Sequence, residues 1–128
     1  MNTIEVQHYF DAAHQLTDSE WLVTKACARL HGHTYAVKVT AQTEELNGAG
    51  MVIDFKAIKE AIDELDHRFI NDVFKENEVD KQPTAENIAV YLAEKITELG
   101  VKVTKVSVCE GYKGIERASW ATYEPELN

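Results

Sequence analysis

The chain has 128 residues and a mass of 14.4 kDa, enough for one domain and too few for two ordinary ones. Its 45% hydrophobic and 27% charged residues are typical of a globular protein, and its 6 glycines and 2 prolines exclude a collagen-like or low-complexity chain. A net charge of -9 has the wrong sign for a protein that holds nucleic-acid phosphates. We expect a single domain over residues 1–128 and no nucleic-acid partner.

The sequence also bears on the compartment. No apolar run approaches the roughly 20 residues of a membrane-spanning helix, and the first residues lack the basic flank and apolar block of a secretory signal. With Cys27 and Cys109 as the two cysteines, a disulfide framework is not expected. We expect a cytoplasmic protein with no membrane partner.

Five segments have the pattern of β-strands. The first two alternate apolar and polar residues with period two, which is typical of half-buried strands. The turn residues Asn47–Gly50 follow them, and the last two segments are rich in β-branched or aromatic residues. The predicted strands cover residues 4–14, 31–41, 51–53, 101–110 and 118–123.

Two helices are predicted between these strands. Asp54 is the expected N-cap of the first, whose apolar stripe runs at three- and four-residue steps over 55–69. Thr84 is the expected N-cap of the second, which Gly100 ends. The order of the elements predicts an α+β fold, an antiparallel four-stranded sheet with a helix pair on one face.

Three histidines fall where strand pairing would bring them together. His31 and His33 are two residues apart in a strand, so their side chains share a face. His14 ends the preceding strand on its apolar face, and a hairpin would place this end beside the start of the next strand. Three imidazoles without a fourth protein ligand are typical of a catalytic zinc with an open position. We therefore predict a Zn²⁺ site of His14, His31 and His33.

Spacing alone leaves a structural interpretation of these histidines open. A lone histidine on an apolar face is usually a hydrogen-bonded core residue, and an isolated His-x-His pair is common. His8 shares the face of His14, but it lies six residues earlier. That separation is roughly 20 Å along a strand, so we exclude His8 as the third ligand.

Other residues could serve a metal site. Cys27 precedes the His-x-His pair, and a nearby dication would favour its thiolate, the form of a base or nucleophile; a buried structural cysteine is the alternative. Asp66 could orient and charge His67 at the end of the first helix, although the pattern by itself favours an exposed surface pair. Glu110 ends an apolar strand as an edge residue or a ligand anchor, and Cys109 is expected in the core.

These pieces occur together in one known family. The motifs are Phe10–His14, Cys27–His33, Asp66–His67, Pro83–Asn87 and Glu110. In this order they resemble the 6-pyruvoyl-tetrahydropterin synthase family, over nearly the whole chain as far as about Glu110. Each motif alone is weak, but the set is highly specific. Three residues separate Cys27 from His31, as in the bacterial branch that makes 6-carboxy-5,6,7,8-tetrahydropterin for queuosine biosynthesis; the animal pyruvoyl branch has a longer gap.

The resemblance implies a role for each matching residue. His14, His31 and His33 would hold the zinc that binds the hydroxyls of the substrate side chain. Cys27 would be the general base that removes a proton from that side chain.

The same resemblance implies roles on the other side of the substrate. Asp66 and His67 would form a proton relay, and Glu110 would grip the 2-amino and N3 edge of the pterin through charge-assisted hydrogen bonds. The candidate cations for the phosphates are Arg29, Lys25 and Lys113.

The implied fold is the tunnelling fold, in which subunits close into barrels, commonly a hexamer of two trimers with active sites at subunit interfaces. The open sheet edges of a small domain also favour association. We expect that Cys27 and Glu110 of one chain need not reach the same zinc. The implied reaction converts 7,8-dihydroneopterin triphosphate to 6-carboxy-5,6,7,8-tetrahydropterin, with release of acetaldehyde and triphosphate.

The chain departs from the family pattern in three places. Gln15 stands where a basic residue is frequent, Ile70 replaces a leucine, and the segment 111–117 lengthens the link to the last strand. Two other functions stay open. The spacing before His31 argues against a pyruvoyl-type synthase, and the presence of Cys27 argues against a non-catalytic pterin- or metal-binding module.

Overall fold

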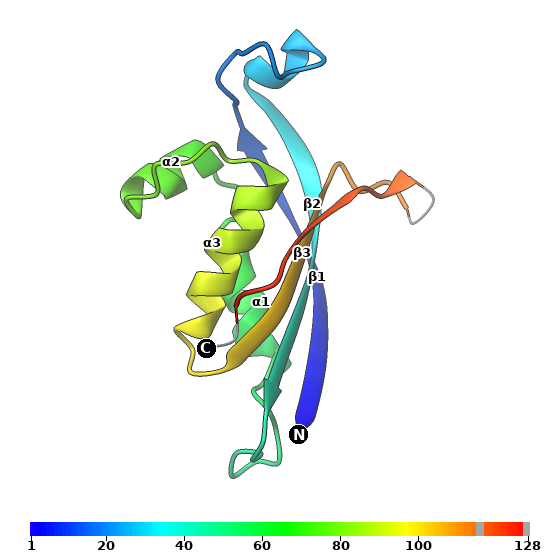
Figure 1. Cartoon of the computed structure of the whole chain (residues 1–128), viewed down its shortest axis with the longest axis vertical. Helices are drawn as coiled ribbons and strands as arrows, with labels where there is room; N and C mark the ends of the chain where they lie inside the picture. The colour runs from blue at the N-terminus through cyan, green and yellow to red at the C-terminus, as the bar shows by residue number, and fades with distance from the viewer. Residues whose placement is uncertain (115–116, 127–128) are drawn as a thin grey trace.

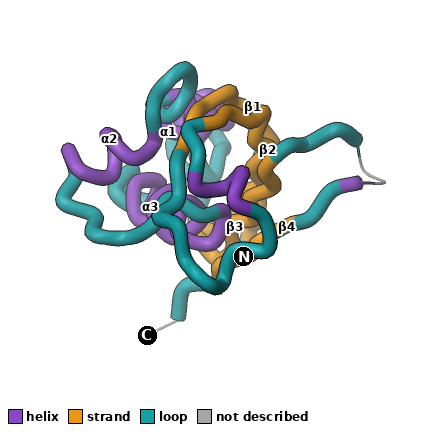
Figure 2. Tube along the Cα trace, turned by 90° about the horizontal axis from the view of Figure 1, so that it is seen from above, coloured by secondary structure: helices purple, strands orange, loops and turns teal. Residues whose placement is uncertain are grey.

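The computed structural model describes residues 1–114 and 117–126. Four strands form one antiparallel sheet in the order β1-β2-β3-β4, with α1 and α3 packed on one face (Figures 1 and 2). Among these residues, no helix is long and apolar enough to cross a membrane. The elements are β1 (Asn2–His14), the 3₁₀ turn η1 (Lys25–Ala28), β2 (His31–Thr43), α1 (Phe55–Asp63), α2 (Ile70–Glu76), α3 (Ala85–Thr97), β3 (Lys102–Glu110) and β4 (Trp120–Tyr123).

The hairpin of β1 and β2 determines where the histidines lie. The two strands have 13 residues each and pair along their whole length, from Asn2 opposite Thr43 to His14 opposite His31. β3 joins the other edge of β2 and ends where Glu110 lies opposite Tyr35. The C-terminal ends of β1 and β3 therefore meet the start of β2 at one end of the sheet.

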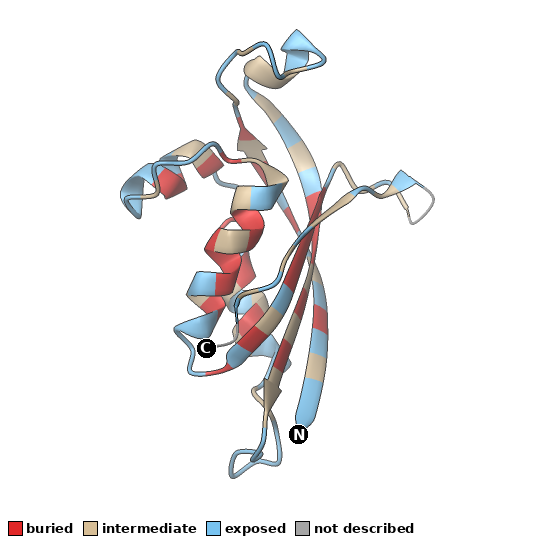
Figure 3. Cartoon of the chain, viewed as in Figure 1, coloured by how far each residue is buried: buried red, intermediate tan, exposed pale blue. Residues whose placement is uncertain are grey.

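The hydrophobic core lies between the sheet and the helices α1 and α3 (Figure 3). Alternate strand residues such as Phe10 and Val37 are buried against helical residues such as Ile62 and Leu92. Each such side chain contributes about 1.5–3 kcal/mol by leaving water. The predicted sheet with helices on one face is thus confirmed, and it anchors the strand ends that carry the histidines.

The predicted helix starts are also found. The Asp54 side chain accepts a hydrogen bond from the backbone N–H of Lys56, and Thr84 accepts one from that of Asn87. Such a cap contributes about 1 kcal/mol. α3 ends at Thr97, and the turn that follows it contains Gly100, whose φ of 89° is left-handed and suits glycine.

Two expectations about secondary structure were wrong. Residues 51–53 form no strand, because the backbone of Met51 bonds to Asn47 within its own loop and not to a neighbouring strand. The helix expected over 55–69 ends at Asp63, and α2 is a separate helix. The chain between them turns away from the helix axis to bond with β1.

That connecting segment covers part of the free edge of β1. The backbone N–H of Asp11 donates to the Asp66 carboxylate, and its carbonyl accepts from the N–H of His67. Ala13 donates to the carbonyl of Arg68. The last residues of β1 are therefore hydrogen-bonded along both edges of the strand, to β2 on one edge and to the connecting segment on the other. Within the longer link at 111–117, residues 115–116 lie outside the described part of the chain, and β4 begins at Trp120.

Candidate metal centre and catalytic site

Three histidine rings meet where β1 ends and β2 begins. His14 lies opposite His31, and His33 lies opposite Ala12. Their side chains share the face of the buried strand residues, since His14 has the parity of Phe10 along β1, and His31 and His33 have the parity of Tyr35 along β2. One nitrogen from each ring lies within 4.8 Å of the other two, so the rings converge as the strand pairing predicts.

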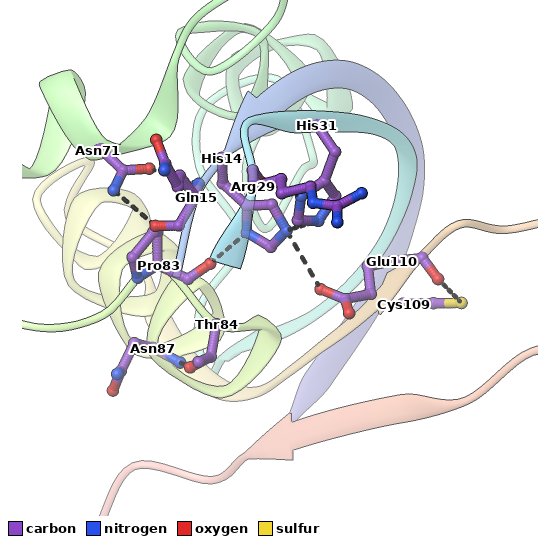
Figure 4. A network of polar contacts seen from close by, with 10 residues as sticks. All are labelled: His14, Gln15, Arg29, His31, Asn71, Pro83, Thr84, Asn87, Cys109 and Glu110. Carbon is purple, nitrogen blue, oxygen red and sulfur yellow. Dashed lines mark hydrogen bonds and ion pairs between the residues drawn. The ribbon is translucent and has the colours of Figure 1, made fainter. Parts of the chain in front are cut away.

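Backbone carbonyls fix the tautomers of two of these rings. His14 Nδ1 lies 2.7 Å from the carbonyl oxygen of Pro83 (Figure 4), and His31 Nδ1 lies 2.6 Å from that of Arg29. A carbonyl only accepts, so each Nδ1 carries the proton and each neutral ring has an unprotonated Nε2. These two Nε2 atoms face each other at 2.9 Å. Two lone pairs at this distance repel each other unless a cation lies between them.

The third ring completes the same arrangement. His33 Nε2 is buried and has no hydrogen-bond partner among the described residues. Burial, which disfavours the charged imidazolium, is the main cause that lowers the pKa of both His14 and His33. Neutral imidazole is the form that binds a metal. Three such donors that lie within 4.8 Å of one another fit a zinc ion.

Glu110 lies beside this cluster in the same chain. Its Oε2 is 4.0 Å from His14 Nε2, and its side chain is 43% exposed (Figure 4). Gly111 follows with a φ of 67°, which turns the chain away directly over His33. Glu110 therefore lies beside the histidines of its own chain, and the expectation that Cys27 and Glu110 of one chain need not reach the same zinc stays a prediction. The partly exposed carboxylate of Glu110 is therefore available to a ligand that binds beside the histidines.

The loop between β1 and β2 carries two further candidates. Cys27 is partly buried in η1, and its carbonyl accepts from the N–H of Leu16. The Arg29 side chain is drawn beside His31 in Figure 4. In the described part of the chain, neither the Cys27 thiol nor the Arg29 guanidinium makes a hydrogen bond or ion pair. Lys25, by contrast, pairs with Asp18 at 2.6 Å.

Asp66 and His67 form a hydrogen-bonded pair beside β1, and His67 lines the same groove as His33. His67 Nδ1 donates to Asp66 Oδ2 over 2.9 Å, which raises the pKa of the imidazole. The pKa of the Asp66 carboxyl is lowered, first by the N–H of Asp11 and then by His67. The His67 side chain is 80% exposed, and its backbone φ of 59° is strained for a non-glycine residue. No hydrogen bond or ion pair links the Asp66–His67 pair to the triad among the described residues.

The remaining candidates have structural contacts. Gln15 donates to the carbonyl of Ala28 and exchanges two hydrogen bonds with Asn71, which ties the loop to α2. His8 Nε2 lies 2.7 Å from Asp63 Oδ1, and His8 is not part of the histidine cluster. Cys109 is buried, as expected.

Sequence reasoning missed two contributors to the site, Pro83 and Asn71. Both reach the end of β1 from positions 69 and 56 residues along the chain from their respective partners. The proline carbonyl acts through its backbone, so no side-chain motif marks this role.

The family is decided by sequence. The sequence model of the family described as 6-pyruvoyl tetrahydropterin synthase matches residues 3–126. The chain belongs to this family. A Pyrococcus furiosus protein named dihydroneopterin monophosphate aldolase is 36% identical over 84% of this chain and 89% of its own length. A Synechocystis protein named 6-carboxy-5,6,7,8-tetrahydropterin synthase is 36% identical over 72% of each chain.

Solved structures agree with this assignment. The Caenorhabditis elegans 6-pyruvoyl tetrahydropterin synthase has a TM-score of 0.65 and 28% identity, over 98% of this chain and 96% of that one. A Wolinella succinogenes protein has a TM-score of 0.63 and 26% identity, over 98% and 100%. The chain is therefore a pterin-biosynthesis enzyme of the lyase type found in this family.

Proposed function

We propose that this enzyme is a zinc-dependent 6-carboxy-5,6,7,8-tetrahydropterin synthase of queuosine or deazaguanine biosynthesis. The observation that carries the proposal is the pair of unprotonated nitrogens of His14 and His31, 2.9 Å apart, with Glu110 at their side. The spacing of Cys27 before the His-x-His pair and the relatives of that name give further support.

The proposed reaction consumes one water. 7,8-Dihydroneopterin triphosphate and water give 6-carboxy-5,6,7,8-tetrahydropterin, acetaldehyde and triphosphate. The dihydropterin ring gains the two electrons and protons that the side chain loses as its first carbon becomes a carboxyl group. No external oxidant or reductant is needed, so the protein has to move protons and hold charge.

The three histidines would hold the metal through their Nε2 atoms. Bound there, zinc lowers the pKa of a coordinated hydroxyl and stabilises developing negative charge on the substrate oxygens. The carbonyls of Pro83 and Arg29 keep the rings of His14 and His31 in the ligating tautomer.

Cys27 would remove a proton from the substrate side chain as its thiolate. Cys27 is partly exposed, and its thiol makes no hydrogen bond within the described chain, which supports a role toward a ligand. Asp66 would keep His67 oriented and charged, so that His67 can donate a proton on the opposite side of the substrate. Each proton transfer contributes on the order of a hundred-fold or more.

Glu110 would bind the pterin. Its carboxylate can accept two N–H groups from the 2-amino and N3 edge of the ring, an arrangement with charge-assisted strength. Its place beside His14 supports this role, because a ring bound there would lie next to a side chain held by the metal. Arg29 is the proposed contact for the phosphates, in a site where Lys25 is already paired with Asp18.

A monophosphate substrate is a second candidate. Lys25, one of the three candidate phosphate contacts, is paired with Asp18, and Gln15, which stands where a basic residue is frequent, donates its side-chain amide to the carbonyl of Ala28. The Pyrococcus relative is named for a dihydroneopterin monophosphate. Triphosphate elimination of the pyruvoyl type and a non-catalytic pterin-binding role are the remaining alternatives.

Assembly forms part of the proposal. The Asp66–His67 pair lies at the outer edge of β1, whereas the triad and Glu110 lie on the helix-covered side. We infer a closed homohexamer of two trimers, in which each active site takes residues from more than one chain.

One incubation tests the proposal. Zinc-loaded protein is given dihydroneopterin triphosphate or dihydroneopterin monophosphate, and the products are identified by mass spectrometry. Acetaldehyde with 6-carboxytetrahydropterin from the triphosphate supports the proposal. Release of triphosphate with the carbon chain intact would assign the pyruvoyl reaction, preferred cleavage of the monophosphate would assign the second candidate, and no turnover would leave a binding module.

A further inference from the structure

The chain passes from one face of the sheet to the other directly after Glu110. Glu110 lies opposite Tyr35 at the end of β3, on the face that α1 and α3 cover. In a continued strand, residue 112 would share that face. Instead, Gly111 has a φ of 67°, and the ring of Tyr112 packs against Tyr9 on the other side of the sheet. Glu110 and Tyr112 therefore lie on opposite faces, joined by one glycine.

The ring of Tyr112 lies across a row of residues on the face away from α1 and α3, which we call the open face. In this row, Tyr9, Ala36, Cys109 and Trp120 stand side by side on the four strands. The ring centroid of Tyr112 is 5.5 Å from that of Tyr9 and 6.2 Å from that of Trp120, at the two ends of the row. The small residues between them, Ala36 and Cys109, are buried. The Tyr112 ring is therefore seated between two outer rings.

The two outer rings are themselves held in place. Gln7 donates a hydrogen bond of 3.0 Å to the hydroxyl of Tyr9. The Lys38 ammonium lies 4.3 Å from the centroid of the Trp120 ring, which is a cation–π contact. Tyr9 and Trp120 thus form an ordered seat for the Tyr112 ring, and we call these three rings the aromatic clamp.

The aromatic clamp restrains the backbone on the far side of Gly111. The backbone N–H of Tyr112 also donates to the carbonyl of Thr34 over 3.0 Å. Glycine is the most conformationally free residue, and Gly111 passes His33, whose Nδ1 would lie 3.6 Å from an added Cβ. Because Tyr112 is anchored, the turn at Gly111 is fixed at both ends. The backbone from which the Glu110 side chain projects is fixed with it.

We propose that Tyr112 is a positioning residue, whose ring in the aromatic clamp holds the Glu110 carboxylate beside His14. This carboxylate lies 4.0 Å from His14 Nε2 and makes no hydrogen bond within the described chain, so its direction comes from the backbone. The consequence for pterin binding rests on the proposed function, whereas the position of the carboxylate does not. A side chain ordered in advance spares binding the cost of ordering it, which is about two- to tenfold in affinity.

Crystal structures of the zinc-loaded parent, Tyr112→Phe and Tyr112→Ala give the first test. Tyr112→Phe keeps the ring, so its Glu110 carboxylate should stay where the parent has it. Tyr112→Ala removes the ring, and the carboxylate should leave its place beside His14 or occupy several positions. A Glu110 carboxylate that is equally ordered in the parental position in Tyr112→Ala would overturn the proposal.

Binding of neopterin, a pterin without phosphates, gives the second test. Isothermal titration calorimetry measures its Kd in the same zinc-loaded proteins and in Glu110→Ala. Tyr112→Ala should weaken binding about two- to tenfold, and Tyr112→Phe should not. In the Glu110→Ala background, Tyr112→Ala should cause no further loss, because the ring acts through the carboxylate. An equal loss in both backgrounds would contradict the proposal, as would no loss in a protein whose affinity does depend on Glu110.

Phe55→Ala is the matched control, since it removes an exposed aromatic ring from α1 and should leave the Kd unchanged. Melting temperatures establish that every variant is folded. If Glu110→Ala binds neopterin as tightly as the parent does, the proposed role of Glu110 in pterin binding fails, and the crystal structures decide the positioning alone. An undisplaced carboxylate in a protein that needs Glu110 for binding would refute only this inference.

Discussion

The Nε2 atoms of His14 and His31 lie 2.9 Å apart although neither carries a proton when the rings are neutral. Both Nδ1 protons are committed to backbone carbonyls. Without a cation, the two lone pairs repel each other in a buried place where protonation is also disfavoured. The folded chain is therefore arranged for a positive ion at this point, and this arrangement sets how metal affects stability.

Zinc is expected to stabilise the fold, because it binds the converged histidines of the native state. At a free zinc concentration of 100 times the Kd, the free energy of unfolding rises by about 2.7 kcal/mol. Thermal unfolding with and without zinc measures this gain. His31→Ala removes one donor, and its melting temperature should not respond to zinc; an equal response in both proteins would show that zinc binds elsewhere.

Asp66→Asn is expected to lower the pKa of His67 toward its ordinary value of 6.5, since Asp66 is the main cause that raises it. An NMR titration of the His67 ring protons in both proteins measures the shift. An unchanged His67 pKa would mean that the pair does not form in solution.

The Asp66–His67 pair also predicts the direction in which the stability of the fold changes with pH. Because the folded pKa of His67 is above 6.5, the pair adds stability below pH 6.5 and loses it as pH rises through the folded value. At the acid end, Asp66 contributes above pH 3.8 and loses its contribution as pH falls through its lowered folded pKa. The exposure of His67 keeps the effect small.

Tyr35→Phe is expected to raise the stability of the metal-free protein by about 1 kcal/mol, the scale of an unmet buried hydroxyl. Tyr35 is fully buried, its ring stacks on Phe10 at 4.9 Å, and its hydroxyl has no partner among the described residues. Urea denaturation compares the variant with the parent. Tyr91→Phe serves as the control, because among the described residues the buried side-chain atoms without a partner include the hydroxyl of Tyr35 and do not include that of Tyr91. A loss of stability on removing the Tyr35 hydroxyl would reveal a hidden partner.

Complementation between chains tests the shared site. Cys27→Ala and His67→Ala should each reduce turnover at least about a hundred-fold while zinc content is kept, because the three ligands remain. After the two variants are dissociated and reassembled together, part of the activity should return, since some sites would combine an intact Cys27 with an intact His67. Reassembly of Cys27→Ala with itself is the control. No recovery in the mixture would place both groups in one chain.

Much of the site could be predicted from the alternation of side chains along the strands and from the pairing of β1 with β2. His31 and His33 share a face because a strand has a period of two, and a hairpin necessarily brings His14 to the start of the next strand. Local capping chemistry likewise predicted the starts of α1 and α3 from Asp54 and Thr84.

Long-range backbone contacts explain what the sequence left out. The apolar spacing of Leu65 and Phe69 continues the helical stripe, but the backbone of His67 bonds to Asp11 instead of continuing α1. The carbonyl of Pro83 orients His14 through an atom that every residue has. Such contacts depend on how distant segments meet, which no local pattern encodes.

The most direct measurement of the central claim is anomalous X-ray scattering at the zinc edge from crystals of the zinc-loaded protein. The account predicts a peak bound by Nε2 of His14, His31 and His33, at about 2.0–2.1 Å from each nitrogen, and absent from His31→Ala crystals. A zinc peak at other residues, or a zinc-loaded protein whose three rings bind no metal, would contradict it.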